Sequence, residues 1–197
     1  MKSLTVATRG GALAIAQTEH VIATLKKIHP GLEIRIKEIT TTGDKDGRTA
    51  LWTLKETGFF TSQVEDALTA READFAVHSF KDLPTAQREG LTIGAVFDRN
   101  SVEDCLVSAS SVESIDQLPA GAKIGTSSLR RAAQLKHLRA DLVPTPIRGN
   151  VHTRLRKLDT KEFDAILLAR AGLQRLGLAD KITFIFDPAV FIPAPAQ

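Results

Sequence analysis

The stretch Asp74-Phe-Ala-Val-His-Ser-Phe-Lys-Asp-Leu-Pro84 decides how the fold of the chain is interpreted. Its apolar run, residues 75–77, predicts a short buried strand, and Pro84 ends regular structure. The residues between them are polar: His78, Ser79, Lys81 and Asp82. A strand that ends in ionisable groups is where an open α/β sheet places its ligand site. The alternative is that Lys81 and Asp82 form a solvated ion pair in a surface turn, since loops are polar by default.

Strands and amphipathic helices alternate on both sides of this stretch. Residues 4–8 and 32–39 have strand patterns and flank a helical pattern over 12–28, which predicts a β-α-β unit with parallel strands. A second helix is expected over residues 59–71, and the polar residues 40–58 between these elements predict a mobile loop. The strand of the opening stretch is expected to run from residue 75 to residue 79. Further strands are expected at 91–97 and 105–107, separated by a polar connector that indicates a domain crossing.

The second half of the chain repeats the alternation. The pattern predicts strands that end near residues 125, 147 and 168, with helices over 129–138, 151–158 and 171–176. A last strand at 182–186 is expected to run back toward the first half. Two α/β lobes joined by crossings predict a cleft between them, the usual place for a small-ligand site.

The composition is that of a folded globular protein: 43% of the 197 residues are hydrophobic and 25% are charged. The sequence has neither a signal-peptide core nor an apolar run that could span a membrane, so a cytoplasmic protein without a membrane partner is expected. The single cysteine, Cys105, lies in an apolar run and is interpreted as a buried structural thiol. The five histidines lack metal-ligand spacing, and no metal is expected.

Positive charge is concentrated between residues 121 and 160, a segment that contains nine lysines and arginines but two aspartates. Such a patch requires an anionic partner: nucleic acid, phosphate or carboxylate. The patch lacks the interleaved aromatic residues of a single-strand nucleic-acid platform, and the whole sequence has no tyrosine and one tryptophan. We therefore expect no nucleic-acid partner.

Two strand-to-helix junctions in the basic half carry arginines. In Gly125-Thr-Ser-Ser-Leu-Arg-Arg131 a serine is suited to cap a helix, and two arginines fall in its first turn. Cations there oppose the helix dipole, which favours an anion bound at the helix start over two merely solvated arginines. Ile147-Arg-Gly-Asn-Val-His-Thr-Arg154 repeats the design, with Gly149 allowing the turn. Arg9, followed by two glycines, is a weaker signal of the same kind near the first strand.

Taken together, these motifs resemble the hydroxymethylbilane synthase family, also called porphobilinogen deaminase. The resemblance rests on Ala76-Val-His-Ser-Phe-Lys-Asp-Leu-Pro84, the two arginine motifs, Ala7-Thr-Arg9 and Ala171-Gly-Leu-Gln-Arg-Leu-Gly177, and it covers essentially the whole chain. It implies a transferase that joins four porphobilinogen units into the linear tetrapyrrole hydroxymethylbilane with release of ammonia. It also implies a dipyrromethane cofactor, porphobilinogen and the growing polypyrrole chain as partners, and a monomer.

The resemblance also implies roles for individual residues. Asp82 matches the catalytic aspartate, whose carboxylate accepts hydrogen bonds from pyrrole N–H groups and stabilises the cation left when ammonia departs. Six arginines would bind carboxylates of cofactor, substrate or growing chain: Arg9, Arg130, Arg131, Arg148, Arg154 and Arg175. The rest of the predicted cofactor-binding set is Ser79, Lys81, Asp82, Thr126, Ser127, Ser128 and Gly149.

Three features depart from the family pattern. Thr57 stands where the family has a lysine of its glycine- and lysine-rich loop, with Lys55 nearby, and Gly11 often corresponds to a serine. The third is the cofactor cysteine, which the resemblance places in a third domain that this sequence does not contain. We therefore expect this 197-residue chain by itself to be inactive or impaired.

The predicted fold is two α/β lobes of the type found in two-domain periplasmic binding proteins, with the active cleft between them. The first lobe is expected to comprise residues 1–98 and 187–197, and the second, rich in arginine, residues 101–186. The alternative function is a non-catalytic binding protein for small carboxylates or tetrapyrroles.

Overall fold

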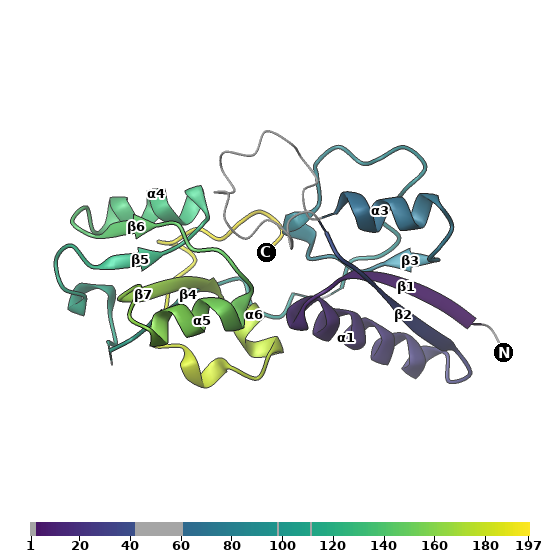
Figure 1. Ribbon diagram of the computed structural model, residues 1–197, viewed down its shortest axis with the longest axis horizontal. Coiled ribbons are helices and arrows are strands. Elements are labelled where there is room, and N and C mark those ends of the chain that lie inside the picture. The colour runs from purple at the N-terminus through teal and green to yellow at the C-terminus, as the bar shows by residue number, and fades with distance from the viewer. Residues whose placement is uncertain (1–2, 42–60, 98, 111) are drawn as a thin grey trace. The chain divides into compact units, whose positions relative to one another are not determined.

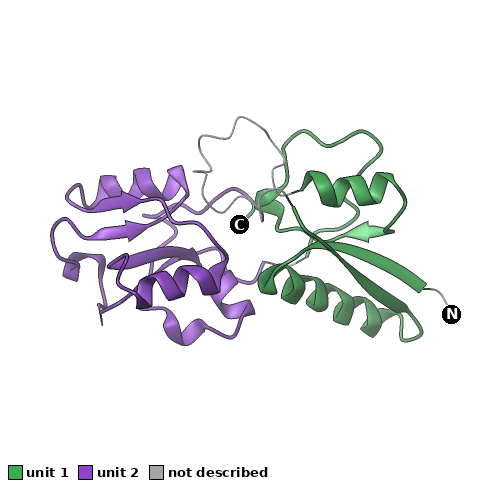
Figure 2. Ribbon diagram, viewed as in Figure 1, with its two compact units in different colours: residues 1–47, 56–98, 196 green, residues 48–55, 99–195, 197 purple. Residues whose placement is uncertain are grey.

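The chain divides into two compact units, each built on its own β-sheet (Figures 1 and 2). The computed structural model describes residues 3–41, 61–97, 99–110 and 112–197. Within these ranges, unit 1 holds residues 3–41 and 61–97 together with residue 196, and unit 2 holds residues 99–110, 112–195 and 197. Most of the loop predicted over 40–58, with the family departures at Lys55 and Thr57, lies outside the described residues.

Unit 1 contains a three-stranded parallel sheet in the order β2-β1-β3. Its strands are β1 (Ser3–Arg9), β2 (Glu33–Ile39) and β3 (Phe75–Ala76), and its helices are α1 (Ala12–Ile28) and α3 (Ser62–Thr69). The predicted β-α-β unit is confirmed, because β1 and β2 pair in parallel on either side of α1 in the sequence. A short 3₁₀ helix, η2 (Phe80–Asp82), follows β3.

The core of unit 1 lies where α3 packs on the central strand. Ala7 of β1 is fully buried and packs with Val64 and Ala67 of α3. A central strand has neighbouring strands on both edges, so its apolar side chains pack against helices on the faces of the sheet. This packing removes them from contact with water. The end of β1 is thereby fixed relative to β3.

Two strand predictions in unit 1 are wrong. The strand expected at 75–79 ends at Ala76, because the chain then turns into η2. Residues 91–97 form no strand: their amide and carbonyl groups find no ladder partner among the described residues. Val96 is 65% exposed there and Ile93 39%. An alternating pattern favours a strand only where a neighbouring strand supplies the hydrogen bonds.

Unit 2 contains a five-stranded mixed sheet in the order β6-β5-β7-β4-β8. The strands are β4 (Asp104–Ser108), β5 (Lys123–Gly125), β6 (Val143–Thr145), β7 (Ala165–Ala169) and β8 (Phe184–Ile185). The helices are α4 (Leu129–Leu138), α5 (Val151–Asp159) and α6 (Arg170–Arg175), with short 3₁₀ turns η3 (Ile115–Gln117) and η4 (Ala179–Lys181). Strands β5, β6 and β7 are parallel, whereas β4 is antiparallel to β7 and to β8.

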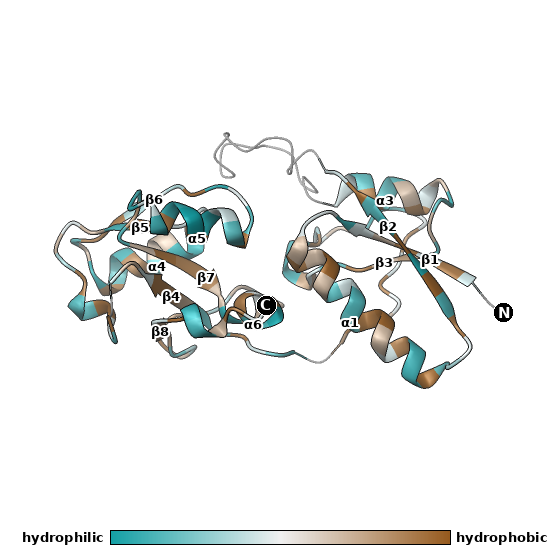
Figure 3. Cartoon of the chain, turned by 60° about the horizontal axis from the view of Figure 1, so that its bottom comes forward, coloured by the Kyte–Doolittle hydropathy of each residue, from teal (hydrophilic) through white to brown (hydrophobic). Residues whose placement is uncertain are grey.

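The residues of β4 and β7 alternate between two hydrophobic clusters, one on each face of the sheet. Leu106 and Leu167 face a cluster that contains Leu135 of α4, while Val107 and Ile166 face a cluster that contains Leu158 of α5. A sheet covered on both faces explains why β7 and the middle of β4 are apolar, as Figure 3 shows. Helix α4 therefore covers one face, and α5 covers the other with α6 (Figure 1).

The end of the chain differs from the prediction. Strand β8 pairs with β4 inside unit 2 and does not return to the first lobe. Residues 187–195, expected in the first lobe, group with unit 2, because Phe191 is fully buried there. Its ring stacks on Phe186 with the ring centroids 4.3 Å apart.

None of the helices in the described ranges is both long enough and apolar enough to cross a membrane.

Candidate functional site

The carboxyl edge of the sheet in unit 1 holds the residues predicted from the opening stretch. Arg9 is the last residue of β1, and η2 with Lys81 and Asp82 follows β3, so both segments leave the sheet at the same edge. The register pairs Ala7 with Ala76, two residues before Arg9 and His78 respectively. The amide of Asp82 donates a 2.9 Å hydrogen bond to the carbonyl of Ser79, which closes the turn. This edge of a parallel sheet is where α/β proteins bind ligands.

Helix α1 supports this turn through Gln17. Its side-chain amide donates to the Ser79 hydroxyl over 2.9 Å, and the hydroxyl lies 3.2 Å from the amide oxygen of the same residue. Ser79 is therefore tied to α1 three positions before Asp82.

His78 is half-buried in the same turn. Burial lowers the pKa of His78, and the carboxylates of Glu65 and Asp82 oppose this shift only in part. The imidazole is therefore neutral at pH 7. A neutral ring carries no positive charge, so His78 does not offset the negative charge of Asp82.

In unit 2, the three polar residues after β5 form a connected set of hydrogen bonds. The amide of Thr126, a buried residue, donates to the carbonyl of Thr145, and its hydroxyl accepts from the amide of Ser128 over 3.2 Å. The hydroxyl of Ser127 donates to the carbonyl of Ile147. The Ser128 hydroxyl accepts from the amide of Arg131 over 3.4 Å, which caps α4 as predicted. These bonds tie the ends of β5 and β6 together.

Gly125 is required at the end of β5 by close packing. A Cβ atom at this position would lie 2.9 Å from Cγ2 of Ile166 and 3.1 Å from a ring carbon of Phe163. Both neighbours belong to the core, so neither side chain is free to move away. The glycine lets β5 lie against the core and fixes where α4 begins.

Arg130 and Arg131, in the first turn of α4, share one buried carboxylate. Nη2 of Arg130 donates to Oδ2 of Asp104 over 2.7 Å, and Nη2 of Arg131 donates to Oδ1 over 2.6 Å. The remaining terminal nitrogens donate to the carbonyls of Ile192 and Leu167. The sequence showed no negative charge to offset the two cations at this helix start. The structure corrects this, because the carboxylate of Asp104 supplies that charge.

Asp104 is not among the residues predicted from the sequence. It is the first residue of β4 and lies opposite Ala169 of β7, at the edge where the parallel strands end. Burial by itself would raise the pKa of Asp104, but the charge of Arg131 and hydrogen bonds from Arg131, Gln197 and Arg130 hold it below its ordinary value. The available signal was a carboxylate immediately before the apolar run 105–107, which was interpreted as part of a polar connector.

The second arginine motif surrounds the start of α5. Gly149 has φ 110°, in the region that favours glycine, and a Cβ there would lie 2.6 Å from Thr153. Asn150 caps the helix by accepting from the amide of Thr153 over 2.9 Å. Nε of Arg154 donates to the carbonyl of Gly149 over 2.8 Å, so this side chain folds back toward the turn and Arg148.

The structure therefore brings the predicted residues of unit 2 to one edge, with one exception. The starts of α4 and α5 follow the parallel strands β5 and β6 and hold seven predicted side chains and Gly149. Arg175 lies in the last turn of α6, at the far end of that helix from the end of β7. Arg170, at the start of α6, was not predicted; it donates to Glu103 over 2.8 Å.

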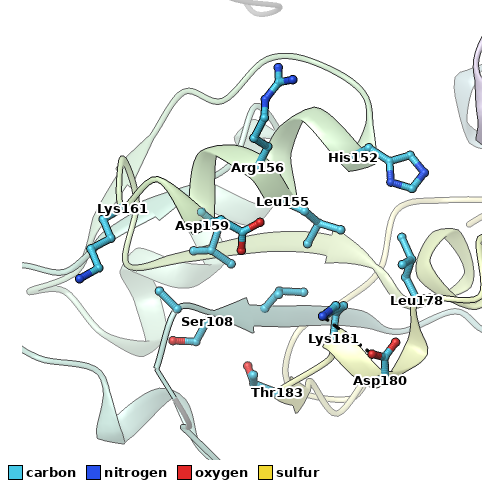
Figure 4. A pocket seen from close by; sticks show the side chains of 13 residues that line it. Ser108, His152, Leu155, Arg156, Asp159, Lys161, Leu178, Asp180, Lys181 and Thr183 are labelled. Atoms are coloured by element: carbon cyan, nitrogen blue, oxygen red, sulfur yellow. Dashed lines mark ion pairs between the residues drawn. The ribbon is translucent and has the colours of Figure 1, made fainter.

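A pocket of about 670 Å³ lies on unit 2 and contains none of the predicted site residues (Figure 4). Its apolar lining includes Val107, Leu155 and Leu178, and its rim carries charges of both signs, including a Lys181–Asp180 pair 3.9 Å apart. The mixed rim favours no particular ligand charge. Most of the predicted site residues lie instead beyond the strand ends.

Cys105 cannot serve as a covalent attachment point at neutral pH. It is fully buried in β4, and burial raises the pKa of its thiol to about 12. The thiol donates to the carbonyl of Leu168. A protonated, inaccessible sulfur is unreactive, as the apolar run predicted.

The chain has two α/β units, and one of them has basic helix starts at its strand ends. This is the fold of the two-lobed periplasmic-binding-protein class. Two solved structures support this fold: the methionine binding protein MetQ (TM-score 0.53, 15% identity, 94% of this chain and 78% of that chain) and a putative methionine-binding lipoprotein from Bacillus subtilis (TM-score 0.50, 12% identity, the same coverage). At these identities the likeness concerns the fold alone.

The sequence comparisons are more specific. The family described as porphobilinogen deaminase, dipyromethane cofactor binding domain, matches residues 4–197. Porphobilinogen deaminases from Fusobacterium nucleatum, Desulforudis audaxviator and Listeria monocytogenes are 47%, 49% and 47% identical to the whole chain. The chain belongs to the porphobilinogen deaminase family, as its motifs predicted. It spans 66%, 63% and 64% of the length of these relatives.

Proposed function

We propose that this chain supplies the catalytic aspartate and the carboxylate-binding arginines of a transferase in tetrapyrrole biosynthesis. This transferase joins porphobilinogen units into hydroxymethylbilane and releases ammonia. The observation that carries the proposal is the kinds of charge that the two strand-end sites hold: an exposed carboxylate in unit 1, beside Arg9 and Lys81, and several arginines in unit 2. Unit 1 presents the carboxylate of Asp82 on an exposed turn, and unit 2 presents arginines at two capped helix starts. The substrate needs both kinds of charge: a carboxylate suits its basic aminomethyl group and pyrrole N–H, and cations suit its acetate and propionate groups.

Asp82 acts on the pyrrole. Its carboxylate accepts a hydrogen bond from the pyrrole N–H and stabilises the positive charge that develops on the ring as ammonia leaves. The turn in which it lies is held by the Ser79 carbonyl and by Gln17, so the carboxylate is positioned before the substrate arrives. Neutral His78 beside it does not cancel the negative charge.

The arginines of unit 2 bind the acetate and propionate groups. Two helix starts direct amide N–H groups toward the same edge as Arg148 and Arg154, and each donor favours an anion. Arg130 and Arg131 share a single carboxylate, so their pair retains a net positive charge.

The same donors fit a dipyrromethane cofactor, which carries several carboxylates. Nε of Arg131 is buried and has no hydrogen-bond partner within the described residues, and a carboxylate oxygen would satisfy it. Arg130, Arg131, Arg148 and Arg154 would hold the acidic side chains, with Ser127 and Ser128 beside them. The cofactor supplies the pyrrole position to which new units are joined. Its covalent anchor is not Cys105, whose thiol is buried and protonated.

The test is substitution of Asp82 in the complete natural gene product. Asp82→Ala and Asp82→Asn should each lower porphobilinogen consumption at least 100-fold, because the stabilising carboxylate is removed, while the circular dichroism spectrum stays unchanged. Asp66→Asn is the matched control, since Asp66 is an exposed carboxylate of the same unit that pairs with Arg88. Normal turnover by both Asp82 variants would refute the proposed role.

A further inference from the structure

Asp104 is a buried carboxylate that contacts two residues of the proposed carboxylate-binding set. Its side chain is 0% exposed, whereas those of Arg130 and Arg131 are 24% and 11% exposed. Each carboxylate oxygen accepts from a different arginine, at 2.7 and 2.6 Å. One carboxylate thus fixes two consecutive guanidinium groups at the start of one helix.

The second nitrogen of each arginine is also held. Nη1 of Arg131 donates to the carbonyl of Leu167 over 3.2 Å, and Nη1 of Arg130 donates to the carbonyl of Ile192. Each guanidinium is therefore bound through two nitrogens, which leaves its plane little freedom to rotate. Because a guanidinium is a planar fork, fixing its plane also fixes the direction in which its other N–H groups point.

These contacts have two opposite consequences for an anionic ligand. The negative charge of Asp104 weakens anion binding, since it cancels part of the positive charge of the arginines. The fixed orientation strengthens anion binding, since the arginines lose no further conformational entropy when a carboxylate arrives. A purely electrostatic role and a positioning role therefore predict effects of opposite sign when the charge of Asp104 is removed.

We propose that Asp104 is a positioning residue, which holds Arg130 and Arg131 in the orientation that binds the carboxylates of the substrate. The inference rests on the proposed function of the arginines. Asp104 touches no substrate itself and acts through the two guanidinium groups. Its removal frees two cations, and the loss of their orientation outweighs the gain in positive charge.

The experiment compares Asp104→Asn with wild type in the complete gene product, with porphobilinogen as the substrate. Asparagine keeps the shape of the side chain and removes its charge. We expect KM for porphobilinogen to rise at least 10-fold and kcat to change less than 3-fold. The same substitution in an Arg130→Gln background should raise KM less than 3-fold, because one of the two arginines through which Asp104 acts is then absent.

Asp141→Asn is the matched control. Asp141 also accepts two hydrogen bonds from one arginine of unit 2, from Nε and Nη2 of Arg139 at 2.8 and 2.7 Å, but at the far end of α4. Its substitution should change KM less than 2-fold. An unchanged or lower KM for Asp104→Asn would overturn the inference, because it would show that Asp104 acts only as a charge.

A second measurement needs no variant and no turnover. In NMR spectra of the unliganded wild-type protein, hindered rotation should give Arg130 and Arg131 resolved signals for their two terminal nitrogens. Arg156, exposed on α5, should give one averaged signal. Averaged signals for Arg130 and Arg131 would overturn the inference even if Asp104→Asn fails to fold. Absence of wild-type turnover with resolved arginine signals would refute the proposed function and leave the fixed orientation standing.

Discussion

Phe191→Ala tests the placement of the chain end in unit 2. The ring is fully buried among residues of the core cluster that contains Leu106 and Leu135, and it stacks on Phe186. Truncating a buried phenylalanine costs about 3–5 kcal/mol, of which the aromatic pair accounts for about 0.5–1.5 kcal/mol. At about 1.4 kcal/mol for each factor of ten, the equilibrium constant for opening unit 2 should rise roughly 10²- to 10⁴-fold.

Native-state hydrogen exchange measures this change separately for each unit. Amides of β7 and α4 should lose protection by the calculated factor, because their strand and helix pack on the same cluster, while amides of β1 in unit 1 keep theirs. Val190→Ala is the control: the neighbouring side chain is 58% exposed and should change the free energy of unfolding by less than about 0.5 kcal/mol. A loss below about 1 kcal/mol for Phe191→Ala, or a loss confined to β1, would refute the placement.

Two further predictions concern the sheet of unit 2. Gly125→Ala should lower the free energy of unfolding by about 1–3 kcal/mol in urea titrations, because the added methyl group would overlap the core side chain of Ile166; an unchanged midpoint would show that the core gives way. Cys105 should react with a soluble thiol reagent at pH 8 roughly 10³-fold more slowly in the folded protein than in urea, because a pKa of about 12 leaves little thiolate. Because the folded protein keeps the thiol proton up to a pH near 12, the free energy of unfolding should fall as the pH rises above 9. Fast labelling of the native protein would contradict both the slow reaction and this pH dependence.

Elements whose signals are local were predicted well. The bounds of α1 and α4 agree with the predicted ranges 12–28 and 129–138, because the apolar periodicity lies within each segment and the capping residue Ser128 directly precedes α4. The parallel pairing of β1 with β2 followed from the β-α-β pattern in the same way. Asp82 and Arg148 follow β3 and β6, as predicted, because a strand followed by a turn is visible in the sequence itself.

Features that depend on distant partners were not predicted. Residues 91–97 have the alternation of a strand, but the pattern does not say whether a neighbouring strand exists. Phe191 lies in a tail rich in proline, and only its packing on Phe186 reveals a core residue. Asp104 lies 26 residues before Arg130 in the sequence, and the place of its carboxylate depends on the antiparallel pairing of β4 with β7. Such contacts are set by sheet order, which periodicity does not encode.

The proposed transferase is tested most directly by measuring ammonia release and porphobilinogen binding in parallel on the complete gene product. The account predicts that the wild-type protein releases one ammonia for each porphobilinogen consumed, and that Asp82→Asn stops this release while porphobilinogen still binds within about threefold of the wild-type affinity. Wild-type protein that binds porphobilinogen and returns it unchanged, without ammonia, would contradict the account and identify a binding protein.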